Sequence, residues 1–244
     1  MPEPESLSEN RPSALARLMA GIAEHAPDIT GGPIDNTPTP DEPGHPEYHR
    51  RQRAEFALSR WQTAAPYRYR DATADHPTVQ AWADRAAADI RDAGILVLHG
   101  SIGTGKTHQA YGALRRIAEA GPRNFQMVAT TAPDLYGLLR PGGSDKGSEH
   151  ELKRLMQIPL LLLDDLGTEK LSEFTEEATY RIVNHRYNES LPLLITTNLP
   201  IKTGAPAPDL VTRLGDRLAS RLAQTATIVG FDGPDLRRTL RSVS

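Results

Sequence analysis

The octapeptide Gly100-Ser-Ile-Gly-Thr-Gly-Lys-Thr107 stands just after the apolar run Ile95-Leu-Val-Leu98. It fits the pattern G-x-x-x-x-G-K-[ST], and the residues that follow it have the pattern of a helix. A strand, a glycine-rich loop and a helix in this order are typical of the phosphate-binding loop of nucleoside triphosphatases. A chance glycine-rich turn is the alternative, and the strand and helix on either side disfavour it. We therefore expect ATP to bind at this loop.

Each residue type in the octapeptide suits this chemistry. Glycine adopts backbone angles closed to other residues, which lets amide N–H groups point at phosphate oxygens. Lys106 supplies a mobile positive charge for the β- and γ-phosphates, and Thr107 supplies a hydroxyl ligand for Mg²⁺. The expected nucleotide-binding residues of the loop are Gly100, Ser101, Ile102, Gly103, Thr104, Gly105, Lys106 and Thr107.

The composition excludes several classes of site. The chain of 244 residues has no cysteine, which excludes disulfides, thiolate zinc sites and a cysteine nucleophile. Its net charge of −3 gives no overall basic signature, so any nucleic-acid contact must come from a local patch. No signal peptide and no apolar run of membrane-spanning length are present. We expect a cytoplasmic protein with no membrane partner.

Residues 1–46 differ from the rest of the chain because they hold 9 of the 20 prolines and 8 acidic residues against two arginines. Such a segment is expected to be mostly disordered. Leu15, Leu18, Met19 and Ile22 are spaced at i, i+3, i+4 and i+7, which predicts one short amphipathic helix. That helix is either a marginal one, packed on its own domain or frayed, or it docks on a partner.

Three regions are expected: the extension 1–46, a helical linker 47–92 and an ATPase domain 93–244. In the last region, near-continuous apolar strands alternate with helices, which predicts an α/β fold with a parallel sheet covered on both faces. The expected strands are 94–99, 125–130, 160–164, 193–197 and 227–231. The expected helices of this region are 106–120, 133–140, 149–157, 173–189 and 208–223. A capping box of Ser148 and Glu151 is expected to open the helix 149–157.

Two acids end the run Leu160-Leu-Leu-Leu-Asp164-Asp165. Because strand C-termini line the ligand crevice of such a sheet, we expect Asp164 to hold Mg²⁺ together with Thr107, and Asp165 to polarise the attacking water. Two acids in an ordinary turn are the alternative. Asn198 ends the next strand at the same rim, where it could bond the γ-phosphate or the water; alone, it is a weak signal.

Arg213, Arg217 and Arg221 recur every four residues, which predicts one face of a helix. They are either a solvated stripe, or locally paired with Asp216, or arginine fingers that reach the ATP of a neighbouring subunit. Arg237 and Arg238 could reach the nucleotide of their own subunit, or they are tail charge.

Four segments in order, GSIGTGKTHQA, LLLLDDLGTEK, VNHRYNESLPLLITTNLP and RLGDRLASRL, together resemble bacterial helicase loaders of the DnaC/DnaI type. These are AAA+ ATPases, with the transposition helper IstB as close kin, and the resemblance covers about residues 56–240. It implies a five-stranded parallel sheet in the order 5-1-4-3-2. By position it implies that the loop is Walker A, that 160–165 is Walker B and that Asn198 is sensor 1. Arg217 and Arg221 match the arginine-finger region, and Arg237 or Arg238 matches the sensor 2 arginine.

The chain departs from the family pattern in three places. Asp165 stands where many AAA+ proteins have glutamate. Only 13 residues follow Phe231, so we expect a reduced or absent C-terminal lid. The cysteine zinc site of some loaders is absent.

The resemblance implies an ATP-dependent loader of a replicative DNA helicase onto single-stranded DNA during replication initiation, acting as an ATP-dependent homo-oligomer. Lys146, Lys153 and Arg154 lie in the region that resembles the DNA-contacting insertion, though a solvated face is the ordinary alternative. Two other functions remain open: an IstB-like ATPase that regulates a transposase on double-stranded DNA, and a nucleotide-gated adaptor with little hydrolysis.

Overall fold

The computed structural model of the chain describes residues 13–25, 36–168, 172–202 and 209–236. It divides into two units, Met1–Thr39 and Pro40–Ser244, and each is described by itself. In the first unit, the predicted amphipathic helix is confirmed as α1 (Ala14–His25), with the Ser13 hydroxyl accepting the Ala16 N–H at 3.2 Å. Its four large apolar side chains are all exposed, by 51% to 68%.

The second unit is built on a sheet of five parallel strands. They are β1 (Ile95–Gly100), β2 (Met127–Thr131), β3 (Leu160–Asp164), β4 (Leu193–Thr197) and β5 (Ala226–Phe231). Their order is β2-β3-β4-β1-β5, which confirms the predicted order read from the other edge. In the central pairs, Leu163 lies opposite Ile195 and Leu98 lies opposite Thr196. The carboxyl ends of β1, β3 and β4 therefore reach the same edge of the sheet.

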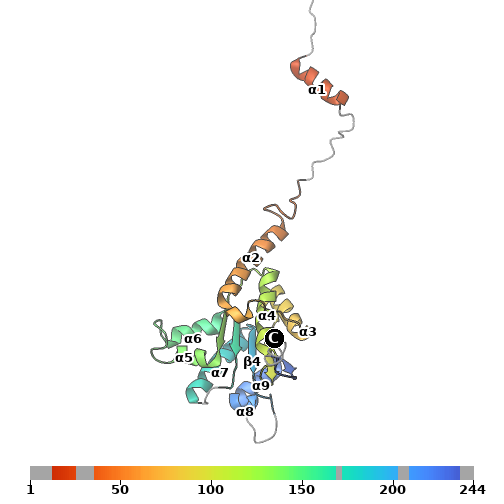
Figure 1. Cartoon of the computed structure of the whole chain (residues 1–244). Helices are drawn as coiled ribbons and strands as arrows, with labels where there is room; N and C mark the ends of the chain where they lie inside the picture. The colour runs from red at the N-terminus through yellow and green to blue at the C-terminus, as the bar shows by residue number, and fades with distance from the viewer. Residues whose placement is uncertain (1–12, 26–35, 169–171, 203–208, 237–244) are drawn as a thin grey trace, which may run out of the picture. The chain divides into compact units, whose positions relative to one another are not determined.

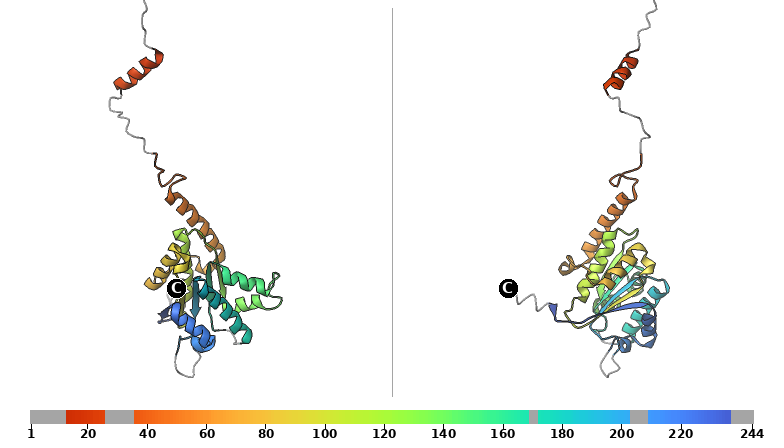
Figure 2. Two further views of the ribbon diagram at one scale, coloured as in Figure 1. Left: turned by 180° about the vertical axis from the view of Figure 1, so that it is seen from behind. Right: turned by 90° about the vertical axis from the view of Figure 1, so that its right-hand side faces the viewer.

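Helices cover both faces of the sheet (Figure 1; Figure 2). Alternate residues of the strands pack on the two opposite layers. Leu96, Leu162 and Leu194 belong to one core cluster, while Val97, Leu163 and Ile195 belong to the other. The first layer contains α2 (Pro46–Ala64), α3 (Pro77–Ala88) and α4 (Lys106–Ala120). The second contains α5 (Ala132–Leu139), α6 (Ser148–Gln157), α7 (Glu173–Asn188), α8 (Leu210–Leu214) and α9 (Asp216–Thr225).

Two buried tryptophans fix α2 and α3 in the first layer. The Trp61 indole N–H donates to the carbonyl of Tyr111 on α4 at 3.2 Å. The Trp82 indole N–H donates to the carbonyl of Gly94, just before β1, at the same distance of 3.2 Å. A buried tryptophan satisfies its single donor in this way. The helices expected over 47–92 are thus part of the hydrophobic core of this layer.

Arg186 of α7 holds the starts of β3 and β4 in place. It is fully buried and donates to the carbonyls of Leu155, Ile158 and Pro159 at 3.1, 2.7 and 2.9 Å, and also to that of Pro192. Burial lowers the pKa of its guanidinium to about 9. The carbonyls in the segments before β3 and before β4 compensate the buried charge. The strands β3 and β4 therefore have a common anchor at the end of the sheet remote from Asp164.

The predicted capping box at Ser148 is wrong. Gly147, with φ of 84°, precedes the helix, and Ser148 is its first residue. The Ser148 hydroxyl donates to the Arg140 carbonyl at 3.2 Å, and Glu151 instead accepts from the Ser144 hydroxyl at 3.1 Å. Residues of the loop before α6 thus bind the Ser148 hydroxyl and the Glu151 carboxylate, the two groups that a capping box requires. A capping box does form at Ser172, which opens α7.

Two predicted boundaries also differ. The expected helix 208–223 is two helices, because Gly215 between α8 and α9 has φ of 74°. Arg213 and Arg221 therefore do not share one continuous helix. The second strand begins at Met127, while Phe125 is a buried core residue just before it. In the described part of the chain, no helix is both long and apolar enough to cross a membrane.

Candidate nucleotide-binding site

Glycine is required at two positions of the loop between β1 and α4. Gly100 has φ of 135°, and a Cβ added there would lie 2.1 Å from the carbonyl oxygen of Phe231 on β5. Gly103 has φ of 84°, and a Cβ there would lie 1.9 Å from a carboxylate oxygen of Asp235. Gly105, with φ of 93°, then leads directly into α4. The loop is shaped by backbone conformations that only glycine adopts readily.

The ammonium of Lys106 is held by the backbone of the loop. It donates to the carbonyls of Gly100 and Ser101 at 2.9 and 2.7 Å, and the side chain is only 5% exposed. The Thr104 hydroxyl donates to the same Ser101 carbonyl at 2.9 Å. The positive charge predicted for phosphate binding therefore lies at the loop itself.

Asp164 connects three elements at the carboxyl edge of the sheet. Its Oδ1 accepts the hydroxyl of Thr107 on α4 at 3.0 Å and the hydroxyl of Thr196 on β4 at 2.5 Å. Burial raises the pKa of Asp164, while the two hydroxyl hydrogen bonds act in the opposite direction. The structure thus brings together the two residues predicted to hold a metal.

Thr107 and Asp164 fit Mg²⁺, because a hydroxyl and a carboxylate are the hard oxygen ligands that this ion prefers. Within the described residues there is no cluster of three or more His, Cys, Asp or Glu side chains that could hold a metal alone. An ion here would need phosphate oxygens and water to complete its octahedral shell, as Mg²⁺ usually does in nucleotide sites.

Asp165 is fixed in an uncommon conformation beside Asn198. Its φ of 57° lies in the left-handed region, which costs a residue other than glycine about 1 kcal/mol or more. Two hydrogen bonds hold it there: its N–H donates to the Thr196 hydroxyl at 3.0 Å, and its Oδ1 accepts the Asn198 amide at 3.1 Å. The two residues predicted to act on water are therefore direct neighbours.

A pocket of about 720 Å³ lies over the loop and beside these two residues. This volume is within the range of pockets that bind small molecules and cofactors. Its lining residues are Arg68, Tyr69, Asp75, Ile102, Gly103, Thr104, Gly105, Lys106, Thr107, His108, Gln109, Asp165, Asn198 and Leu236. The loop from Ile102 onward, Asp165 and Asn198 thus line one cavity, as the sequence predicts.

The segment before α3 forms a wall of this pocket that sequence reasoning missed. The N–H of Thr73 donates to the ring of His108 at 3.2 Å, and the N–H groups of Asp75 and His76 donate to the side chain of Gln109 at 2.9 and 3.1 Å. His108 and Gln109 directly follow Thr107. The segment is therefore bound to the first turn of the helix that the loop opens. Its irregular backbone has no periodicity that could have revealed this contact.

Thr196 is the second residue that the sequence analysis missed. The run Thr196-Thr197-Asn198 predicts side chains at the carboxyl edge of the sheet, but only Asn198 was given a role there. In the structure the Thr196 hydroxyl donates to Asp164 and accepts from the N–H of Asp165, so it fixes both acids.

Of the arginines in the predicted stripe, Arg213 and Arg221 are not among the residues that line the pocket. Arg221 stacks on two tyrosines of α7, with its guanidinium 5.2 Å from the ring centre of Tyr187 and 5.9 Å from that of Tyr180. Arg213 lines a separate small pocket beside Tyr136. The side chain of Arg217, and the whole of Arg237 and Arg238, lie outside what the structure describes.

Comparison with known proteins identifies the family to which this chain belongs. The family model described as IstB-like ATP binding protein matches residues 47–244. An ATP-binding protein in an insertion sequence of Mycobacterium tuberculosis is 28% identical over 157 residues, which cover 63% of this chain and 60% of that protein. The replicative helicase loader DnaI of Bacillus subtilis is 26% identical over 104 residues, which cover 42% of this chain and 32% of that protein. This chain thus spans less than two thirds of the length of either relative.

A crystal structure of the DnaC helicase loader superposes with a TM-score of 0.55 and 28% identity, covering 68% of this chain and 100% of that chain. Together with the strand order, this likeness confirms the AAA+ P-loop fold and the predicted resemblance.

Proposed function

We propose, from the premise that this chain belongs to the family of IstB-like ATP binding proteins, that it hydrolyses ATP to load a replicative DNA helicase onto single-stranded DNA. The observation that carries the ATPase part is the pocket in which the loop, Asp165 and Asn198 meet beside Asp164. The likeness to the DnaC helicase loader along that whole chain supports the loading part.

Each group at the pocket has a role in this proposal. Lys106 and the loop amides bind the β- and γ-phosphates, and Thr107 and Asp164 hold Mg²⁺, which neutralises phosphate charge when bound. Asp165 accepts a proton from the attacking water, and Asn198 orients that carboxylate and the water. Tyr69 and Arg68 also line the pocket and offer an aromatic and a cationic group to the base.

ATP hydrolysis serves as a timer in this account. ATP binding favours an assembly of several copies, and hydrolysis releases it, because the two nucleotide states differ in the contacts that they make. Arg217 or Arg221 completes the site of a neighbouring copy. The exposed apolar face of α1, in a unit of its own, suits a helix that docks in a groove of the helicase.

The relative from an insertion sequence favours a second candidate function. It matches 63% of this chain, against 42% for the helicase loader DnaI. In that case the protein assembles on double-stranded DNA and regulates a transposase. A third candidate, an adaptor that binds ATP with little turnover, is separated from both by measuring ATP turnover with and without DNA.

A pulldown with the full chain as bait separates the first two candidates. The Asp165→Asn variant, expected to bind ATP without hydrolysing it, is compared with Lys106→Ala, expected to bind ATP much more weakly. Recovery of a hexameric helicase from the host extract only with ATP-loaded Asp165→Asn supports loading. Recovery of a transposase, together with preference for double-stranded over single-stranded oligonucleotides, contradicts loading and supports the second candidate.

A further inference from the structure

The outermost strand β2 has one open edge. Among the described residues it pairs with β3 alone. The carbonyl of Gln126, just before the strand, accepts the N–H of Leu160 at 3.0 Å. Because backbone groups alternate in direction along a strand, those of Met127 and Ala129 point away from β3. This edge therefore offers alternating N–H donors and C=O acceptors, as an added strand requires.

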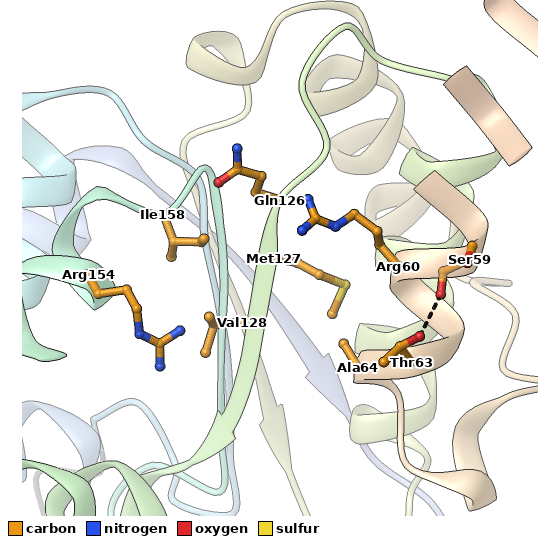
Figure 3. A pocket seen from close by; sticks show the side chains of 9 residues that line it. All are labelled: Ser59, Arg60, Thr63, Ala64, Gln126, Met127, Val128, Arg154 and Ile158. Carbon is orange, nitrogen blue, oxygen red and sulfur yellow. Dashed lines mark hydrogen bonds between the residues drawn. The ribbon is translucent and has the colours of Figure 1, made fainter. Parts of the chain in front are cut away.

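A groove of about 390 Å³ lies along the beginning of this edge (Figure 3). The C-terminal half of α2 forms one wall, and the end of α6 forms the other. The two helices belong to opposite layers of the sheet. The groove is lined by Ser59, Arg60, Thr63, Ala64, Gln126, Met127, Val128, Arg154 and Ile158.

Each wall of the groove carries an arginine. Arg60 is exposed, stacks 5.3 Å from the ring centre of Phe56, and has no ion pair within the described part of the chain. Arg154 bonds the carboxylate of Glu151 through Nε at 2.7 Å, which leaves the terminal nitrogens of its guanidinium for another partner. Figure 3 shows the Arg60 guanidinium beside Gln126 and that of Arg154 beside Val128. No acidic side chain lines the groove.

We propose that this groove binds an extended segment of a partner protein, which pairs with β2 as a sixth strand and carries two adjacent acidic residues. Neighbouring side chains of a strand point to opposite faces of the sheet, so one acid meets Arg60 and the next meets Arg154. The main chain of the segment bonds the open edge at Met127 and Ala129.

The open strand edge favours a peptide over a nucleic acid. A nucleic-acid backbone presents phosphate acceptors, which suit the arginines but leave the outward carbonyls of β2 without donors. A polypeptide satisfies both the charges and the alternating backbone groups. The groove shares no lining residue with the nucleotide pocket, so this site is independent of the proposed ATPase activity.

The test uses a fluorescein-labelled peptide, acetyl-Thr-Val-Thr-Glu-Glu-Thr-Val-Thr-amide, and the full chain in an anisotropy titration. Arg60→Glu and Arg154→Glu should each weaken binding about tenfold or more, because each removes a charge-assisted contact and adds a repulsion. Lys153→Glu is the matched control, since Lys153 is an exposed neighbour on α6 that does not line the groove. It should leave the affinity within about twofold, as expected for a remote surface charge.

A charge swap makes the test specific. A peptide with Lys-Lys in place of Glu-Glu should bind the doubly reversed protein and not the wild type. Methylating the backbone nitrogens that face β2 should abolish binding of the acidic peptide, because the strand pairing is lost. Binding of a fluorescent ATP analogue should be unchanged in every variant. If a charge reversal disturbs folding, the neutral substitutions Arg60→Gln and Arg154→Gln replace it.

Equal binding of the acidic and basic peptides by the wild type would overturn the proposal. So would undiminished binding of the acidic peptide by the doubly reversed variant. Binding of oligothymidylate through these two arginines, with no binding of the peptide, would replace the proposed partner with a nucleic acid.

Discussion

The hydroxyl of Thr196 on β4 lies 2.5 Å from Oδ1 of Asp164 on β3 and also accepts the N–H of Asp165 at 3.0 Å. One side chain thus positions both acids at the carboxyl edge of the sheet. Its own place is fixed by the pairing of β4 with β1, where it lies opposite Leu98, and by the pairing of β3 with β4 up to Ile195.

Thr196→Val should lower kcat for ATP hydrolysis by about 10–100-fold, the usual effect of losing a residue that orients a metal ligand. Thr196→Ser keeps the hydroxyl and should retain most of the activity. Steady-state kinetics on both variants check this, with unfolding curves as a control. Equal activities of the valine and serine variants would show that the hydroxyl does not matter.

Lys106→Ala should weaken ATP binding at least about tenfold, because a charge-assisted contact to phosphate is lost. Isothermal titration calorimetry on the folded variant measures this. Unchanged affinity would remove the loop from the binding site.

Arg186→Met should destabilise the fold by about 3 kcal/mol or more, because several buried carbonyls lose their donor. Urea unfolding followed by circular dichroism measures this. Arg181→Met on the same helix is the matched control, since Arg181 makes an exposed pair with Glu149 and should cost at most about 1 kcal/mol. Equal stabilities of the two variants would contradict the role given to Arg186.

Arg221→Ala should spare ATP binding but remove hydrolysis that depends on assembly, by a factor on the order of 10³ if Arg221 is the finger. Arg221 also stacks on Tyr187 and Tyr180, so Tyr187→Ala serves as a control for lost packing. Mixing Arg221→Ala with Asp165→Asn protein should partly restore activity, since some interfaces then join an intact Asp165 to an intact Arg221. The same test with Arg217→Ala decides between the two arginines. Mixed assemblies without activity would contradict action between subunits.

The sequence predicted the strands well because residues 160–163 of β3 and 193–195 of β4 are apolar at every position, and both strands are buried on two faces. The order of the strands came from the resemblance, since periodicity does not determine which strands pair. The contact between Asp165 and Asn198 could be anticipated because both end strands of one parallel sheet.

Other features depend on tertiary contacts that no local pattern encodes. The double role of Thr196 depends on the register between β3 and β4. The wall formed by Tyr69 and Asp75 depends on side chains of α4 that bind an irregular segment. The predicted capping box failed because a left-handed glycine, Gly147, replaced the cap.

Single-turnover hydrolysis of ATP by Asp165→Asn tests the central claim, that this pocket hydrolyses ATP with Asp165 as the proton acceptor. Wild-type protein, saturated with Mg²⁺ and ATP in the presence of single-stranded DNA, should release phosphate. Asp165→Asn should bind ATP with an affinity within about threefold of wild type and release phosphate at least about 100-fold more slowly, as expected for loss of a general base. Phosphate release by Asp165→Asn at the wild-type rate would contradict this account.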